Sequence, residues 1–121
     1  MKRRLAAIIP AVAVAALAVP MVTATSASAN ASCGTTVSDK DGSAWGVYAN
    51  GANERSGSST GCGINGLADS NDRLDYHCYT VGSDGHTWTY LRDDNGTNAD
   101  VYGWVRDDLL SNGGSYVYCG F

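Results

Sequence analysis

Residues 73–91 read RLDYHCYTVGSDGHTWTYL, and this stretch decides the fold class of the chain. Residues 73–81 alternate between apolar and polar side chains, which is typical of a half-buried strand. The alternation predicts one face of Leu74, Tyr76 and Cys78 and an opposite face of Asp75, His77 and Tyr79. The letters GSDG indicate a turn, and residues 86–91 return as a second strand. The stretch therefore predicts an antiparallel hairpin.

Further short strands separated by turn residues are predicted on both sides of this hairpin. They cover residues 44–49 (AWGVYA), 101–105 (VYGWV) and 115–119 (SYVYC). No sustained period of 3.6 residues appears, so no long helix is expected, and residues 106–110 (RDDLL) suit a single 3₁₀ turn. About five short strands with a long early loop predict an all-β fold, in the form of a small barrel.

The N-terminal residues 1–29 have the three-part layout of a secretory signal peptide. A cationic MKRR precedes an alanine-rich apolar run, and SASA places Ala27 and Ala29 at the small-residue positions of a cleavage site. Cleavage after Ala31 also fits, and a membrane anchor is the alternative interpretation. We predict a signal peptide over residues 1–29 and one domain over residues 30–121. The expected location is extracellular or associated with the cell wall.

The charge of the expected secreted part differs from that of the whole chain. Three of the eight basic residues lie in the leader, which leaves five against 12 acidic residues, a net charge of about −7. Nucleic acids and anionic membranes both reward a basic surface. We therefore expect neither as a partner. A domain of about 92 residues also has only a marginal core of its own.

Two disulfides are expected to stabilise this small domain. All four cysteines lie in the expected secreted part, at Cys33, Cys62, Cys78 and Cys119. A zinc site is less favoured because no pair has the C-x-x-C spacing. Sequence permits three pairings. We predict Cys78–Cys119, because the tail can return beside the strand that holds Cys78, and Cys33–Cys62, which would tie down the nearest loop.

No catalytic, metal-binding or cofactor-binding residue is predicted. The only histidines are His77 and His86, and no G-x-S-x-G motif accompanies them. His77 adjoins Cys78, but neighbouring strand residues point to opposite faces, so a Cys–His pair is not expected. The acidic loop 93–100 lacks the glycine and glutamate of an EF-hand, and a solvated loop is its simpler interpretation.

Three motifs in the middle of the chain together resemble the bacterial SH3-type domains. NERSGSSTGC, residues 53–62, resembles the signature N-x-R-S-G-P-S-T. TWTYLR resembles the W-x-x-V strand of that family, and GWVRDDLL resembles its ending G-W-V-x-x-x-Y-L. The resemblance covers residues 53–110 and implies an SH3-like barrel of a secreted actinobacterial type, in which residues 52–62 belong to a long early loop. The chain departs from the pattern at Glu54, Ser58, Cys62 and Leu109.

The resemblance also directs attention to the aromatic residues. Leu91 matches a core position of the family, so Trp88 and Tyr90 on the opposite strand face are expected to point outward or into a groove. The alternative is that these rings complete a small core. The predicted ligand-binding residues are Trp88, Tyr90, Trp104, Arg55 and Arg106. Near the end of the motif, Val105 and Leu110 are expected to be buried, and Asp107 and Asp108 to be exposed.

These observations predict a secreted, noncatalytic binding module. The family resemblance implies cell-wall peptide or peptidoglycan as the ligand. A disulfide-stapled inhibitor, or another factor that binds a secreted protein, is the main alternative, and a small enzyme is the third. Fold alone does not decide among them.

Overall fold

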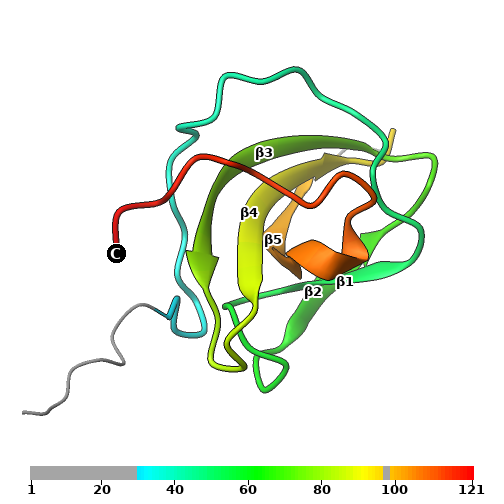
Figure 1. Cartoon of the computed structure of the whole chain (residues 1–121). Helices are drawn as coiled ribbons and strands as arrows, with labels where there is room; N and C mark the ends of the chain where they lie inside the picture. The colour runs from blue at the N-terminus through cyan, green and yellow to red at the C-terminus, as the bar shows by residue number, and fades with distance from the viewer. Residues whose placement is uncertain (1–29, 97–98) are drawn as a thin grey trace, which may run out of the picture.

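The computed structural model describes residues 30–96 and 99–121, so the predicted leader, residues 1–29, lies outside the described residues. The fold is all-β, as predicted, with five antiparallel strands in one sheet and two disulfides. The elements in chain order are β1 (Ala52–Arg55), β2 (Ile64–Ala68), β3 (Arg73–Val81), β4 (Thr87–Asp94), β5 (Val101–Arg106) and the 3₁₀ helix η3 (Asp107–Leu109) (Figure 1). Among the described residues, no helix is long and apolar enough to cross a membrane.

The hairpin of residues 73–91 is confirmed as β3 and β4. Its turn is closed by a hydrogen bond of 2.7 Å from the backbone N–H of Gly82 to the carbonyl of His86. Gly85 adopts a φ of 81°, which glycine reaches without a steric penalty. The strand predicted at 101–105 and the 3₁₀ turn are also confirmed, as β5 and η3.

The first and last predicted strands are wrong; β1 lies where a loop was expected, and β2 lies in a stretch for which no strand was predicted. Residues 44–49 contribute only single bridges, from Gly46 to Leu74 and from Ala49 to Leu110, and the tail contributes one bridge between Tyr118 and Tyr79. The hairpin of β1 and β2 instead falls in and after the polar stretch 52–62. Strand formation there depends on partners rather than on local apolar alternation, since β1 pairs with β2 on one side and with β5 on the other.

The sheet is not closed into a barrel, contrary to the predicted barrel. The strand order is β2-β1-β5-β4-β3, so β2 and β3 are its two edges. Two irregular segments cover the edge of β3: Lys40 donates its N–H to the carbonyl of His77 at 3.0 Å, and Tyr79 donates to Val117 at 2.8 Å. Figure 1 shows the N-terminal segment (cyan) and the C-terminal segment (red) on this side of the sheet. Covering an edge protects it from pairing with another chain.

A β-bulge in the middle of β3 changes which face Cys78 occupies. Tyr76 lies opposite Leu91, but Cys78 lies opposite the next residue of β4, Tyr90, so His77 is the extra residue. The bulge shifts the alternation by one, and Cys78 faces away from the side of Tyr76. The predicted common face of Leu74, Tyr76 and Cys78 is therefore wrong for Cys78, and that of Asp75, His77 and Tyr79 is wrong for Tyr79.

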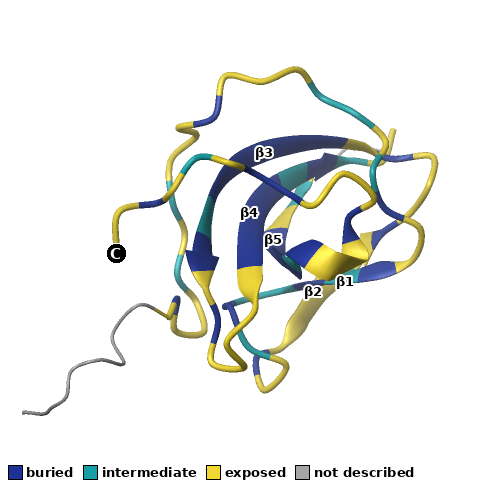
Figure 2. Cartoon of the chain, viewed as in Figure 1, coloured by how far each residue is buried: buried dark blue, intermediate teal, exposed yellow. Residues whose placement is uncertain are grey.

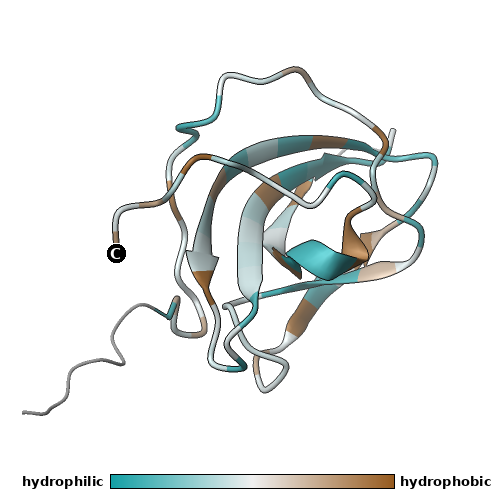
Figure 3. Ribbon diagram, viewed as in Figure 1, coloured by the Kyte–Doolittle hydropathy of each residue, from teal (hydrophilic) through white to brown (hydrophobic). Residues whose placement is uncertain are grey.

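The two sheet faces carry two separate cores. One consists of Ala49, Ala52, Ala68, Leu74, Tyr76, Leu91, Val105 and Leu110, and the other of Ala31, Cys78, Trp88, Tyr90, Trp104 and Cys119. The burial predicted for Val105 and Leu110 is confirmed, as are the disulfides Cys33–Cys62 and Cys78–Cys119. Figure 2 shows that β3 and β4 are buried along much of their length, whereas Figure 3 shows few strongly hydrophobic residues there.

The turn after β5 differs from the prediction at Asp107. Asp108 is exposed as expected, but Asp107 is buried, and its Oδ1 accepts a hydrogen bond of 2.6 Å from Oγ1 of Thr89. The same Thr89 oxygen accepts the N–H of Ser115 at 2.9 Å. Asp107 therefore belongs to a polar junction between β4, η3 and the C-terminal segment, instead of lying on the solvated side of the turn.

Candidate functional site

The three aromatic rings predicted to bind ligand are core residues. Trp88 is 2% exposed, Tyr90 4% and Trp104 0%, so the expectation that Trp88 and Tyr90 face outward or into a groove is wrong. Both indoles are anchored from within the protein: Trp88 donates to the Asp84 carboxylate at 3.1 Å and Trp104 to the carbonyl of Thr35 at 3.0 Å. The alternative, that these rings complete a small core, is confirmed.

The two arginines predicted to bind ligand are engaged with protein atoms. Arg55 donates to the carbonyls of Thr60 and Cys62, both at 3.0 Å, and so holds the loop that ends in the Cys33–Cys62 disulfide. Arg106 lies between two carboxylates, with Asp108 at 2.7 Å and Asp84 at 3.4 Å. The residues predicted from sequence therefore do not form one surface site. The three rings are buried in a core, and the two arginines bind backbone and side-chain atoms of the protein.

A different set of residues forms a hollow on the opposite face of the sheet. Its volume is about 250 Å³, and it lies between the N-terminal segment, β3 and the C-terminal segment. We call it the tyrosine groove; its principal lining residues are Asp41, Ser43, Tyr48, Tyr76, Asn112 and Tyr116. Side chains from three separate parts of the chain thus meet at one surface.

Two consecutive glycines bring the C-terminal segment to the tyrosine groove. Gly113 and Gly114 have φ values of 85° and 83°, a region that other residues rarely adopt. A Cβ on Gly114 would lie 2.2 Å from Oδ1 of Asp107, which leaves no room for a side chain. The chain can therefore turn closely over η3 and place Tyr116 at the rim, where it is 86% exposed.

The floor of the groove is built around Tyr76. Its ring lies 5.5 Å from that of Tyr48, and its hydroxyl donates to Oδ1 of Asn112 at 2.6 Å. Burial, followed by the proximity of Tyr48, raises the pKa of Tyr76 above its usual range. The hydroxyl stays protonated at physiological pH and holds the Asn112 side chain in position.

Asp41 supplies a fixed negative charge beside the tyrosines. Burial alone would raise the pKa of Asp41, but hydrogen bonds from Ser115 and Ser43 outweigh it and hold the pKa below its ordinary value. The Ser115 hydroxyl donates to Oδ2 at 2.7 Å, and the backbone N–H of Ser43 donates to Oδ1 at 2.9 Å. Asp41 is therefore ionised at physiological pH.

Two further hollows adjoin the tyrosine groove through shared residues. Tyr48 also lines a hollow of about 500 Å³ that includes Val47 and Leu109, and Tyr116 also lines one of about 240 Å³ that includes Tyr79. The tyrosine groove therefore shares one tyrosine with each of the other two hollows. Within the described part of the chain, none of the residues that line them is basic.

Sequence reasoning missed the residues of this groove. Tyr48 and Tyr116 fell in segments that were predicted to be regular strands, where their exposure did not stand out. One signal was present: the chain has seven tyrosines and a single phenylalanine. Tyrosine has an apolar ring and a polar end, and it is enriched at binding surfaces.

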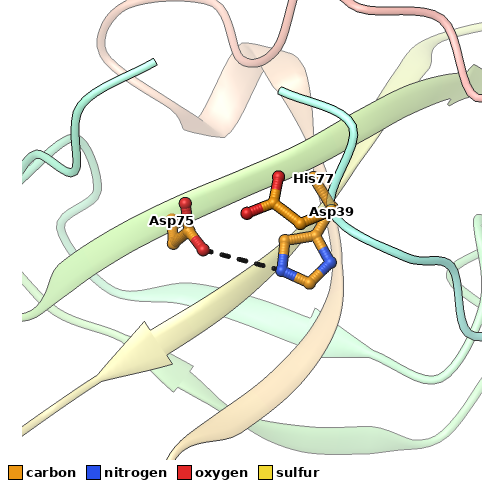
Figure 4. A group of neighbouring side chains, drawn as sticks. All are labelled: Asp39, Asp75 and His77. Atoms are coloured by element: carbon orange, nitrogen blue, oxygen red, sulfur yellow. Dashed lines mark ion pairs between the residues drawn. The ribbon is translucent and has the colours of Figure 1, made fainter. Parts of the chain in front are cut away.

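Asp39, Asp75 and His77 form a second cluster of chemically reactive side chains. Their potential ligand atoms all lie within 4.8 Å of one another. Figure 4 shows Asp75 and His77 on β3 and Asp39 approaching from the N-terminal segment. Burial, then the Asp39 carboxylate, raises the pKa of Asp75, while His77 and Arg92 act in the opposite direction. No metal site was predicted at these residues from sequence.

The interpretation of residues 93–100 as a solvated acidic loop is wrong at its start, because Asp93 and Asp94 belong to β4 and Asp93 is buried. Residues 97 and 98 of this stretch lie outside the described residues.

Comparisons with protein-family models, with curated proteins and with solved structures find no match to this chain. The resemblance to bacterial SH3-type domains therefore stays a prediction.

Proposed function

We propose that this protein is a secreted, noncatalytic binding module whose tyrosine groove recognises cell-wall peptide. The observation that carries the proposal is that the tyrosine groove shares Tyr48 with one neighbouring hollow and Tyr116 with another. Neighbouring hollows suit an extended ligand, which can place different groups in different hollows. Tyrosine rings pack against the apolar parts of such a ligand, and their hydroxyls bond its polar groups.

The charge of the groove favours a ligand that carries amines. Asp41 lines the tyrosine groove and is ionised at physiological pH, whereas in the neighbouring hollows Asp107 is buried against Thr89 and Asp108 pairs with Arg106. Peptides of the bacterial cell wall carry amines as well as amides and carboxylates, and an amine can pair with Asp41, whereas a polymer charged only by phosphate groups offers Asp41 no such partner. Cell-wall peptide therefore fits this surface better than an anionic polymer does.

Two further features support the proposal. The first is the end of the sheet: β3, β4 and β5 pair in succession, and η3 follows β5. Leu110 then pairs with Ala49. This 3₁₀ turn and the buried Leu110 agree with the ending that the SH3 resemblance implies. Two disulfides are compatible with a secreted protein. The resemblance in turn points to the cell wall as the place of binding.

Sedimentation with insoluble peptidoglycan tests this function. The wild-type protein should be removed from solution, and Tyr116→Ala should weaken binding about tenfold because the rim of the groove is lost. Tyr118→Ala is the matched control, since this tyrosine is also exposed but is not a lining residue of the tyrosine groove. Binding to a secreted protease at a one-to-one ratio, with none to peptidoglycan, would support the inhibitor instead.

A further inference from the structure

We propose that Asp39, Asp75 and His77 bind a divalent first-row transition-metal ion such as Zn²⁺. This site is separate from the tyrosine groove, since none of the three residues lines it. The three side chains combine an imidazole with two carboxylates, which are ligand types that zinc takes in proteins. The proposal rests on the orientation of the imidazole, on the spacing of the ligand atoms and on their burial.

The imidazole of His77 is oriented with its second nitrogen toward the carboxylates. Nδ1 lies 3.2 Å from the backbone carbonyl of Val37, which can only accept a hydrogen bond. Nδ1 therefore carries the hydrogen, and Nε2 of the neutral ring presents a lone pair. Metal-binding histidines commonly donate their other N–H to a carbonyl in this way, which fixes the tautomer.

The distances suit an intervening ion better than a direct hydrogen bond. Nε2 of His77 lies 3.7 Å from Oδ2 of Asp75, which is beyond hydrogen-bonding distance. Two ligand atoms bound tetrahedrally to one zinc ion lie about 3.4 Å apart, given metal–ligand distances of about 2.1 Å. The His77–Asp75 spacing needs little adjustment, and the exposed Asp39, whose Oδ1 accepts the N–H of Asp41 at 3.1 Å, has a ligand atom within 4.8 Å of the other two.

Burial makes this arrangement unfavourable without a cation. The side chains of His77 and Asp75 are each only 9% exposed. The Nε2 lone pair and the Asp75 carboxylate then face each other with little water to separate them, and the exposed Asp39 carboxylate adds a second negative charge beside them. The positive charge of Arg92 acts on Asp75, but this guanidinium also has other partners. It lies over the ring of Trp45 at 4.4 Å and pairs with Asp100 at 3.5 Å.

The three residues lie where the N-terminal segment meets β3, so a bound ion would affect how this segment is held. His77 is the bulged residue of β3, and Asp39 belongs to the N-terminal segment that pairs with it, since Lys40 donates to the His77 carbonyl. A bound ion would tie this segment to the sheet. Three protein ligands leave a further position for water or a ligand group on the exposed side of Asp39.

The ligand set also predicts which ions bind. One imidazole nitrogen and two carboxylates suit Zn²⁺, whereas Ca²⁺ takes six to eight oxygen ligands in proteins. Zn²⁺ should therefore raise the melting temperature of the protein after treatment with EDTA, because an ion that binds only the folded state stabilises it. Ca²⁺ at the same concentration should have little effect.

Titration of the EDTA-treated protein with Zn²⁺, followed by NMR of the imidazole nitrogens, tests the site. The Nε2 signal of His77 should shift on binding, and that of His86, the only other histidine, should not. Asp39→Asn should weaken Zn²⁺ binding about tenfold or more. This variant changes an exposed side chain, so loss of folding does not obscure the result. His86→Gln is the matched control and should bind as the wild type does.

Three results would overturn the proposal. The first is a His77 signal that does not respond to Zn²⁺. The second is equal weakening of binding by Asp39→Asn and His86→Gln, which would indicate nonspecific surface binding. The third is a Ca²⁺ effect on the melting temperature as large as that of Zn²⁺. Peptidoglycan sedimentation is read separately, so failure of the metal site would leave the proposed function standing.

Discussion

At the scale of single residues, the least expected feature is a buried pair of carboxyl groups, Glu54 and Asp93. Both residues are 0% exposed, and all four of their carboxyl oxygens lack a hydrogen-bond donor. A proton shared between the two groups supplies the missing donor. Burial, followed by a hydrogen bond and the charge of Asp93, raises the pKa of Glu54 to about 9, and burial raises that of Asp93 to about 6.

This pair predicts a stability that falls as the pH rises. In the unfolded chain Glu54 ionises near its ordinary pKa of 4.5, whereas in the folded state it keeps its proton to about 9. Its contribution is therefore complete below about pH 4.5 and is lost as the pH rises through about 9. Glu54→Gln cannot ionise and still offers a donor to Asp93. The variant should be more stable than the wild type by about 1–3 kcal/mol at pH 8, and by much less at pH 5.

Urea unfolding at both pH values measures this difference. Asp108→Asn, which alters an exposed carboxyl group, serves as the control and should follow the pH dependence of the wild type. A wild-type stability that is constant from pH 5 to pH 8 would contradict the shared proton. So would a Glu54→Gln variant that is destabilised equally at both values.

At the scale of elements, the junction after β5 depends on both an apolar and a polar contact. Leu110→Ala should cost about 2–5 kcal/mol because it empties part of a small core. Asp107→Ala should cost about 1–3 kcal/mol, since Thr89 loses its buried acceptor. Asp108→Ala removes only an exposed ion pair with Arg106 and should cost under about 1 kcal/mol. Thermal melts of the three variants give this order; equal midpoints for Asp107→Ala and Asp108→Ala would contradict the junction.

The two disulfides stabilise different elements and should be separable by their effect on binding. Cys78–Cys119 joins β3 to the segment that carries Tyr116, whereas Cys33–Cys62 joins the N-terminus to the loop after β1. Replacing either pair by alanines should cost about 3–4 kcal/mol, given separations of 41 and 29 residues. Only loss of Cys78–Cys119 should also weaken peptidoglycan binding at a temperature where both variants are folded. Equal weakening would mean that the C-terminal segment does not carry the site.

Elements with a strong local pattern could be predicted from sequence, and those that depend on distant partners could not. The β3–β4 hairpin was predictable because alternation and turn residues lie within 73–91. The bulge at His77 has no local signal, yet it moves Cys78 to the face that carries Trp88, Tyr90 and Trp104. β1 was missed for the same reason, since its residues are small or polar and its strand form depends on β2 and β5.

At the scale of the whole molecule, the two terminal segments determine what each face of the sheet can do. On one face they cover the indole rings: Thr35 accepts the N–H of Trp104, and Cys119 bonds to Cys78. On the other face they meet each other, where Ser115 donates to Asp41, and they form the walls of the tyrosine groove. Neither segment has the regular alternation by which sequence reveals position. The candidate site could therefore not be predicted from local pattern.

The central claim is that this groove binds cell-wall peptide, and an NMR titration tests it most directly. A soluble peptidoglycan fragment is added to the ¹⁵N-labelled protein, and the backbone amide shifts are followed. The largest changes should fall at Ser43, Asn112 and Tyr116, with little change at Arg55 or at the indole N–H of Trp88. Changes centred on Arg55 and Trp88, or none at millimolar fragment, would contradict the claim.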